Sequence, residues 1–120
     1  REIEEAIQAH SAIAEVAVVG VADQLKGQMP LAFAVVKDPA RTATADDRAK
    51  LEKEVMQTVD GLLGAIARPS RVVFVNGLPK TRSGKMLRRS IQAIAEGRDP
   101  GDLTTLDDPT TLDQVRQALG

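Results

Sequence analysis

The sequence predicts an α+β fold, a small two-layer α/β sandwich in which helices pack on a sheet of about three strands. Three short runs of apolar and β-branched residues have the length of buried strands, at 16–21, 31–36 and 71–75. The segments around them place apolar residues three or four positions apart, which is typical of amphipathic helices. With 120 residues the chain has room for about one hydrophobic core, so a single domain over 1–120 is expected.

The first third of the chain is predicted to form one helix and a pair of strands. Residues 1–9 carry apolar side chains at helical spacing, at Ile3, Ala6 and Ile7. The strands at 16–21 and 31–36 should pair across a polar connection at 23–30. Because the chain opens within a helix, we expect it to be a piece of a larger protein.

A long helix is predicted for the middle of the chain, after a loop at 40–45. It should begin near Asp46 and end near Gly61 and Gly64. Its apolar stripe is expected to consist of Leu51, Val55, Val59, Leu62 and Leu63.

The strand at 71–75 is followed by a turn-forming segment at 76–79, which ends it. The polar stretch 80–84 must then be an exposed loop. A further helix is predicted after it, with Gly97 as its C-cap and with an apolar face formed by Leu87, Ile91 and Ile94.

Residues 98–120 are expected to form a turn-rich tail that ends in a short helix. Asp108 followed by Pro109 is a favourable N-cap and first helical position. The terminal helix would bury Leu112, Val115 and Leu119.

Charge is distributed unevenly along the chain. The net charge is -1, yet residues 61–95 contain no acidic residue and hold seven basic ones: Arg68, Arg71, Lys80, Arg82, Lys85, Arg88 and Arg89. Such a basic region favours a phosphate-bearing ligand, whereas the acidic remainder disfavours extended contact with a nucleic-acid backbone. The two aromatic residues, Phe33 and Phe74, lie in apolar strands and offer no exposed stacking platform. A nucleic-acid-binding module is therefore the disfavoured alternative.

Composition excludes several other kinds of site. There is no cysteine and one histidine, so neither a disulfide framework nor a metal site is expected in this chain. No apolar run approaches the roughly 18 residues of a membrane span, and the charged first residues cannot begin a signal peptide. We expect no membrane partner and a cytoplasmic location.

The segment 78–86, Leu-Pro-Lys-Thr-Arg-Ser-Gly-Lys-Met, is the one that suggests chemistry. A glycine directly before Lys85, at an expected helix start, lets the backbone approach an anion that the ammonium also reaches. A Walker A loop does not fit, because six residues separate Gly77 from Gly84 and Met86 follows the lysine.

The string PKTRSGKMLRR at 79–89 resembles the terminal signature of the adenylate-forming superfamily, which includes acyl-CoA synthetases, luciferases and peptide-synthetase adenylation domains. The resemblance covers the whole chain. Residues 1–7 are similar to the helix that follows the hinge in that superfamily, and HSAIAEVAVVGV at 10–21 is similar to its strand entry. Residues 26–28, Lys-Gly-Gln, resemble its next turn. The chain thus looks like the C-terminal mobile domain of an AMP-forming acyl-CoA synthetase.

This resemblance implies an activity and a set of partners. Lys85 would be the catalytic residue that contacts the substrate carboxylate and the nucleotide during adenylation, and Gly84 and Arg82 would help to bind the nucleotide. The domain would then rotate so that CoA attacks the acyl adenylate. ATP and CoA are the implied cofactors, Mg²⁺ would be bound mainly through the protein's own N-terminal domain, and this chain alone should be inactive.

Within the superfamily, residues 91–109 are most similar to propionyl-CoA synthetases and more distantly to acetyl-CoA synthetases. The implied substrate is therefore propionate, with acetate or another short-chain acid as the alternative. Acetate-activating enzymes carry an arginine near the position of Asp60 that helps to bind CoA, so the acidic residue here leaves that contact in doubt.

Two further interpretations concern the basic residues. Arg82, Arg88 and Arg89 are either solvated charges or contacts to phosphate or a partner. Separately, the resemblance to bacterial members implies that Lys85 could be the modification site of a lysine acyltransferase, reversed by a deacylase.

Overall fold

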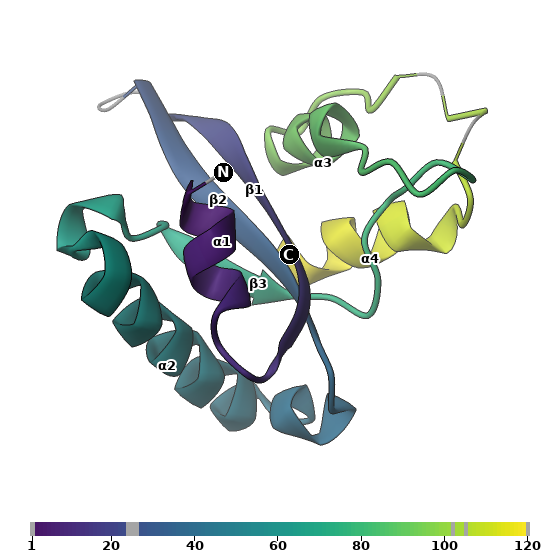
Figure 1. The fold of residues 1–120 in the computed structure, drawn as a ribbon. Coiled ribbons are helices and arrows are strands. Elements are labelled where there is room, and N and C mark those ends of the chain that lie inside the picture. Colours follow the sequence, from purple (N-terminus) through teal and green to yellow (C-terminus); the bar gives the residue numbers. More distant parts are fainter. Residues whose placement is uncertain (1, 24–26, 102, 105, 120) are drawn as a thin grey trace.

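The computed structural model describes residues 2–23, 27–101, 103–104 and 106–119. Its helices and strands follow one another along the chain (Figure 1) as α1 (Glu2–Gln8), β1 (Ile13–Asp23), β2 (Gly27–Val36), η1 (Pro39–Thr42), α2 (Ala45–Leu63), η2 (Ala65–Ala67), β3 (Arg71–Phe74), α3 (Arg88–Ala95) and α4 (Thr110–Leu119). The predicted α+β class is confirmed. No helix in these ranges is long and apolar enough to span a bilayer.

The sheet has three strands, as predicted, and their order is β1-β2-β3. β1 runs antiparallel to β2, whereas β3 runs parallel to it. The central strand is buried on both faces over Leu31–Ala34, which explains its uninterrupted apolar sequence.

The predicted polar connection at 23–30 is wrong over most of its length. Residues 27–30 belong to β2 and pair with residues 20–23 of β1. The antiparallel ladder continues through polar, half-exposed positions that hydrophobicity does not mark as strand. Lys26, part of the proposed turn, lies outside the described residues, as does Arg1.

Helices cover both faces of the sheet, so the molecule has a third layer that the two-layer prediction did not include (Figure 1). α1 and α2 pack on one face, in a core that contains Ile7, Ala34, Leu51, Val55 and Val72. α3 and α4 pack on the other face, in a core that contains Phe33, Val73, Ile91, Leu112 and Val115. Side chains alternate between these two cores along each strand.

Side-chain caps fix the start of α2. Thr44 accepts a hydrogen bond from the Asp47 N–H at 3.0 Å, and the acidic residues of the first turn suit the positive helix end. The helix ends at Gly64, which has a φ of 88°. The predicted apolar stripe is wrong for Leu62 and Leu63, which are 59% and 37% exposed because the helix extends past its core.

The ends of the C-terminal helices follow the sequence predictions. Gly97 has a φ of 75°, and the Arg98 N–H donates to the Ala93 carbonyl at 2.7 Å, a Schellman arrangement that ends α3. Asp108 accepts from the Thr110 N–H at 3.0 Å and thereby caps α4.

Candidate functional site

Residues 79–87 form a small hairpin between β3 and α3, here called the lysine hairpin. Lys80 and Met86 pair across it as an antiparallel bridge, and the Thr81 N–H donates to the Lys85 carbonyl at 2.9 Å. The Gly84 N–H donates to the Thr81 carbonyl at 2.8 Å, and Gly84 has a φ of 90°. A turn closed by a glycine at positive φ is typical of three-residue hairpin loops.

The tip of the lysine hairpin faces solvent. All four of its residues are exposed: Arg82, Ser83, Gly84 and Lys85. Hydrogen bonds between Thr81 and Ser83 hydroxyls, at 2.9 Å, and from the Lys85 N–H to the Thr81 hydroxyl, at 3.1 Å, hold the turn from within. The expected exposed segment is therefore confirmed, and its hydrogen bonds give it the defined geometry of a hairpin turn.

The expectation that Lys85 stands at a helix start is wrong. α3 begins at Arg88, three positions later. The reason is that the Lys85 carbonyl accepts the Thr81 N–H across the hairpin, so the chain is extended there and not helical. No helix N-terminus adds its partial charge to an anion at Lys85.

The base of the lysine hairpin is held on three sides. Pro79 is fully buried, and its carbonyl accepts the Leu87 N–H at 3.0 Å. The Lys80 ammonium forms an ion pair with Glu15 of β1. The Lys80 carbonyl accepts the Asp107 N–H from the tail at 2.9 Å.

Sequence reasoning missed Glu15 and the tail contacts as parts of this site. Leu106 was a usable signal, because it is an apolar residue between polar ones in a segment predicted to be turn-rich. It is 6% exposed and forms an antiparallel bridge with Thr81.

Ion pairs divide the seven basic residues into two groups. Arg68 pairs with Asp60, Lys80 with Glu15, and Arg88 with Glu4 at 2.7 Å. Within the described ranges, no ion pair reaches the other four: Arg71, Arg82, Lys85 and Arg89. The tip of the hairpin thus keeps its positive charge available for an anionic ligand.

The ion pair between Glu4 and Arg88 also fastens α1 to α3. Glu4 accepts from the Val18 N–H at 2.8 Å and from Arg88 at 2.7 and 3.1 Å. Partial burial raises the pKa of Glu4, but hydrogen bonds from Arg88 and Val18 and the nearby positive charge outweigh it, so the pKa is lowered. Arg88 therefore has a structural partner within the domain, a role that neither of the two interpretations of this arginine included.

Asp60, the departure from the acetate-activating pattern, is paired with Arg68. The Arg68 Nε donates to Asp60 Oδ1 at 3.0 Å, and this hydrogen bond lowers the pKa of Asp60 and raises that of Arg68. Together the two side chains present no net charge at this surface.

Metal ligands are not clustered in the part of the chain that the structure describes, where no three His, Asp or Glu side chains could hold an ion together. His10 lies just after α1, accepts from the Ala12 N–H at 3.1 Å and contacts Glu54 at 3.2 Å. These contacts are typical of a structural residue at a helix end.

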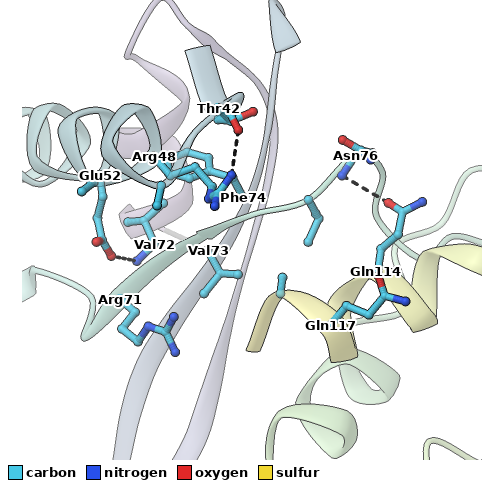
Figure 2. A pocket seen from close by; sticks show the side chains of 14 residues that line it. Thr42, Arg48, Glu52, Arg71, Val72, Val73, Phe74, Asn76, Gln114 and Gln117 are labelled. Atoms are coloured by element: carbon cyan, nitrogen blue, oxygen red, sulfur yellow. Dashed lines mark hydrogen bonds between the residues drawn. The ribbon is translucent and has the colours of Figure 1, made fainter. Parts of the chain in front are cut away.

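A groove of about 540 Å³ runs along the outer edge of β3 between α2 and α4 (Figure 2), away from the lysine hairpin. Side chains of the two helices bond to the strand edge: Glu52 accepts from the Val72 N–H at 2.7 Å, and Gln114 accepts from the Asn76 N–H at 3.2 Å. These contacts are typical of a protected sheet edge. The groove contains none of the candidate site residues.

Comparisons with known proteins identify the family to which this chain belongs. Residues 2–85 match the sequence model of the AMP-binding enzyme C-terminal domain. A propionate–CoA ligase of Escherichia coli is 59% identical over 119 residues, which are 99% of this chain and 19% of that protein. An acetyl-coenzyme A synthetase of Pyrobaculum arsenaticum is 44% identical over 98% of this chain and 17% of its own length.

The solved acyl-CoA synthetase of Brucella canis superposes with a TM-score of 0.61 at 36% identity, over 71% of this chain and 15% of that one. The chain thus spans about a fifth of the length of the curated relatives it matches.

Proposed function

Because this chain belongs to the AMP-binding enzyme C-terminal domain family, we propose that it is the lysine-bearing domain of an AMP-forming ligase that joins propionate to CoA. The reaction has two halves: a carboxylate and ATP give an acyl adenylate and pyrophosphate, and CoA then displaces AMP. Acetate or another short-chain acid is the alternative substrate. The observation that carries the proposal is an exposed hairpin tip whose cations have no ion-pair partner among the described residues.

Lys85 would act in the first half-reaction. Attack of a carboxylate on the α-phosphate brings negative charges together, and a positioned ammonium offsets that repulsion as the charge develops. The carboxylate is itself the nucleophile, so no general base is needed. The exposure of Lys85 supports this role, because the ammonium can reach a ligand held by another part of the protein.

Arg82 and Gly84 are the proposed nucleotide contacts beside Lys85. Arg82 is exposed, and a Cβ added to Gly84 would meet nothing within 4 Å, which leaves the backbone open to close approach by a ligand. Arg89 joins them as an exposed cation on the first turn of α3.

The remaining four-fifths of the protein would supply the acyl pocket, most of the ATP site and the magnesium site. The described residues offer no donor set for Mg²⁺, so we assign this ion to that larger part. A cytoplasmic location belongs to the same proposal, because the ligase reaction draws on ATP and CoA.

The proposal is tested by the Lys85→Ala variant of the full-length protein. Propionate-dependent exchange of pyrophosphate into ATP should fall on the order of a hundredfold or more. Thioester formation from supplied propionyl adenylate should change much less. Lys53→Ala, an exposed lysine on α2, is the control and should keep both activities.

Equal loss of both half-reactions in Lys85→Ala would contradict the assigned role. The 120-residue chain alone, given propionate, ATP, Mg²⁺ and CoA, should form no propionyl-CoA. Robust turnover by this chain would overturn the domain assignment.

A second candidate function is regulatory: Lys85 as the target of a lysine acyltransferase, reversed by a deacylase. Its exposure on the hairpin tip supports access without unfolding. Acylation replaces the ammonium by a neutral amide, so adenylation should stop while thioester formation continues.

Mass spectrometry of the acylated full-length enzyme should locate the group on Lys85, and deacylase treatment should restore adenylation. Modification confined to Lys80 or Lys26, or full adenylation with Lys85 quantitatively acylated, would contradict this candidate.

A further inference from the structure

The C-terminal tail meets the lysine hairpin in the segment that leads into α4 (Figure 1). Leu106 and Thr81 form an antiparallel bridge, and the Asp107 N–H donates to the Lys80 carbonyl at 2.9 Å. Because Lys80 also pairs with Met86, the tail adds a third short strand to the hairpin. This strand lies beside the arm that does not carry Lys85.

The tail segment is itself firmly attached to the body of the domain. Leu106 is 6% exposed and packs in the same core as Ile91, Leu112 and Val115. Two residues further on, Asp108 caps α4 through the Thr110 N–H and hydroxyl at 3.0 and 2.7 Å. Asp107 therefore lies between a buried anchor and a capped helix, which fixes the direction of its N–H.

We propose that Leu106 and Asp107 are positioning residues for Lys85, acting through the backbone of Lys80. This inference rests on the proposed adenylation role of Lys85. Both residues lie beyond the 2–85 segment matched by the family model. The contacts that would position Lys85 therefore include a part of the chain outside that match.

The lysine hairpin can bend where its tip joins its base. The hydrogen bonds that shape the tip join Thr81, Ser83, Gly84 and Lys85 to one another, so they do not set the direction of the tip relative to the sheet. That direction is set at the base, by the Leu87 N–H on one arm and by the tail on the other. Loss of the tail bond leaves the ammonium of Lys85 with a wider range of positions, and small misplacements of a catalytic group are costly in rate.

Two substitutions of Asp107 separate the role of its backbone N–H from the role of its side chain. Asp107→Pro deletes the N–H that Lys80 accepts, and proline favours an extended residue before it, as Leu106 is in its bridge. Asp107→Ala removes the exposed carboxylate and keeps the N–H. Both variants are made in the full-length protein.

Three readouts are needed: pyrophosphate exchange, thioester formation from supplied adenylate, and amide hydrogen exchange at Thr81 and Gly84. Asp107→Pro should slow pyrophosphate exchange roughly tenfold, through kcat more than through the KM for propionate. Thioester formation should change less, and the two hairpin amides should exchange faster. Asp107→Ala should match the unmodified protein in all three.

Equal adenylation rates in Asp107→Pro and Asp107→Ala would overturn the proposal. So would a loss shared equally by both half-reactions with a lowered unfolding temperature, which is the signature of a purely structural role. Amide hydrogen exchange distinguishes a failure of this positioning role from a failure of the proposed adenylation function. If Lys85→Ala kept full adenylation while Asp107→Pro still loosened the hairpin, the tail would support the hairpin but the catalytic assignment would be wrong.

Discussion

The base of the lysine hairpin is attached to the rest of the domain, whereas its tip is exposed to solvent. The base contains buried Pro79 and Leu106, an ion pair from Lys80 to Glu15, and backbone bonds to the tail. The tip, at 82–85, is exposed, and hydrogen bonds among Thr81, Ser83 and Lys85 shape it from within. This difference shows how a small domain can present an exposed cation at a defined place, since the contacts to the rest of the domain are made a few residues away from it.

The largest stability effect should come from the base. Leu106→Ala removes a side chain that is 6% exposed, and it should lower the free energy of unfolding by about 2–4 kcal/mol. Urea unfolding of the chain measures this, with Leu62→Ala as the control, because Leu62 is 59% exposed and should cost less than about 0.5 kcal/mol. Equal effects of the two substitutions would mean that Leu106 is not an anchor.

A smaller effect is expected where the tip turns. Gly84 has a φ of 90°, so Gly84→Ala should cost about 1 kcal/mol from backbone strain alone, since no atom lies within 4 Å of the added methyl group. Gly61→Ala is the matched control, because this position is helical and equally open, and the change there should stabilise by about 0.5–1 kcal/mol. Opposite signs in thermal unfolding check the prediction.

Acid should weaken the carboxylate contacts that join α1 to α3 and that cap α4. The pKa values of Glu4 and Asp108 are lowered, and that of Asp108 is lowered by hydrogen bonds from Thr110. A lowered pKa in the folded state contributes stability above the unfolded value, and this contribution is lost as pH falls below about 4. Glu4→Gln should therefore be less stable than the unmodified chain at neutral pH and closer to it at about pH 3. A constant difference between the two proteins across this pH range would contradict the role of Glu4.

The smallest effect is expected for an arginine of the tip. Arg82→Ala removes an exposed side chain outside any ion pair of the described chain, so the free energy of unfolding should change by less than about 0.5 kcal/mol. Lys80→Ala breaks the ion pair with Glu15 and should cost up to about 1 kcal/mol. A larger loss in Arg82→Ala would show that the tip carries structural contacts of its own.

Local sequence patterns were sufficient for most helices and strands. Periodicity located α2, and glycines located its end and the end of α3, because Gly64 and Gly97 act within a few residues of themselves. The pattern of charge also indicated which segment would be exposed. These features depend on short stretches of chain, which a sequence displays directly.

Contacts between distant segments could not be predicted in the same way. Bonds such as that between Asp107 and Lys80 join main-chain groups, which every residue except proline possesses in full, so the identity of a non-proline side chain does not reveal them. The same is true of the pairing that extends β2 back to Gly27. The prediction that Lys85 stands at a helix start was wrong for a related reason. The hydrogen bonds that form the hairpin at this position also join backbone groups.

The two outer strands have a consequence for how the domain behaves when nothing else covers it. The outward N–H groups of Val18 and Ala22 on β1 bond to Glu4 and Glu96, and that of Val72 on β3 bonds to Glu52. Carboxylates in these places repel a second copy as well as occupying the donors that it would need. A sheet protected in this way does not offer these edge N–H groups to strands of other molecules when it faces solvent.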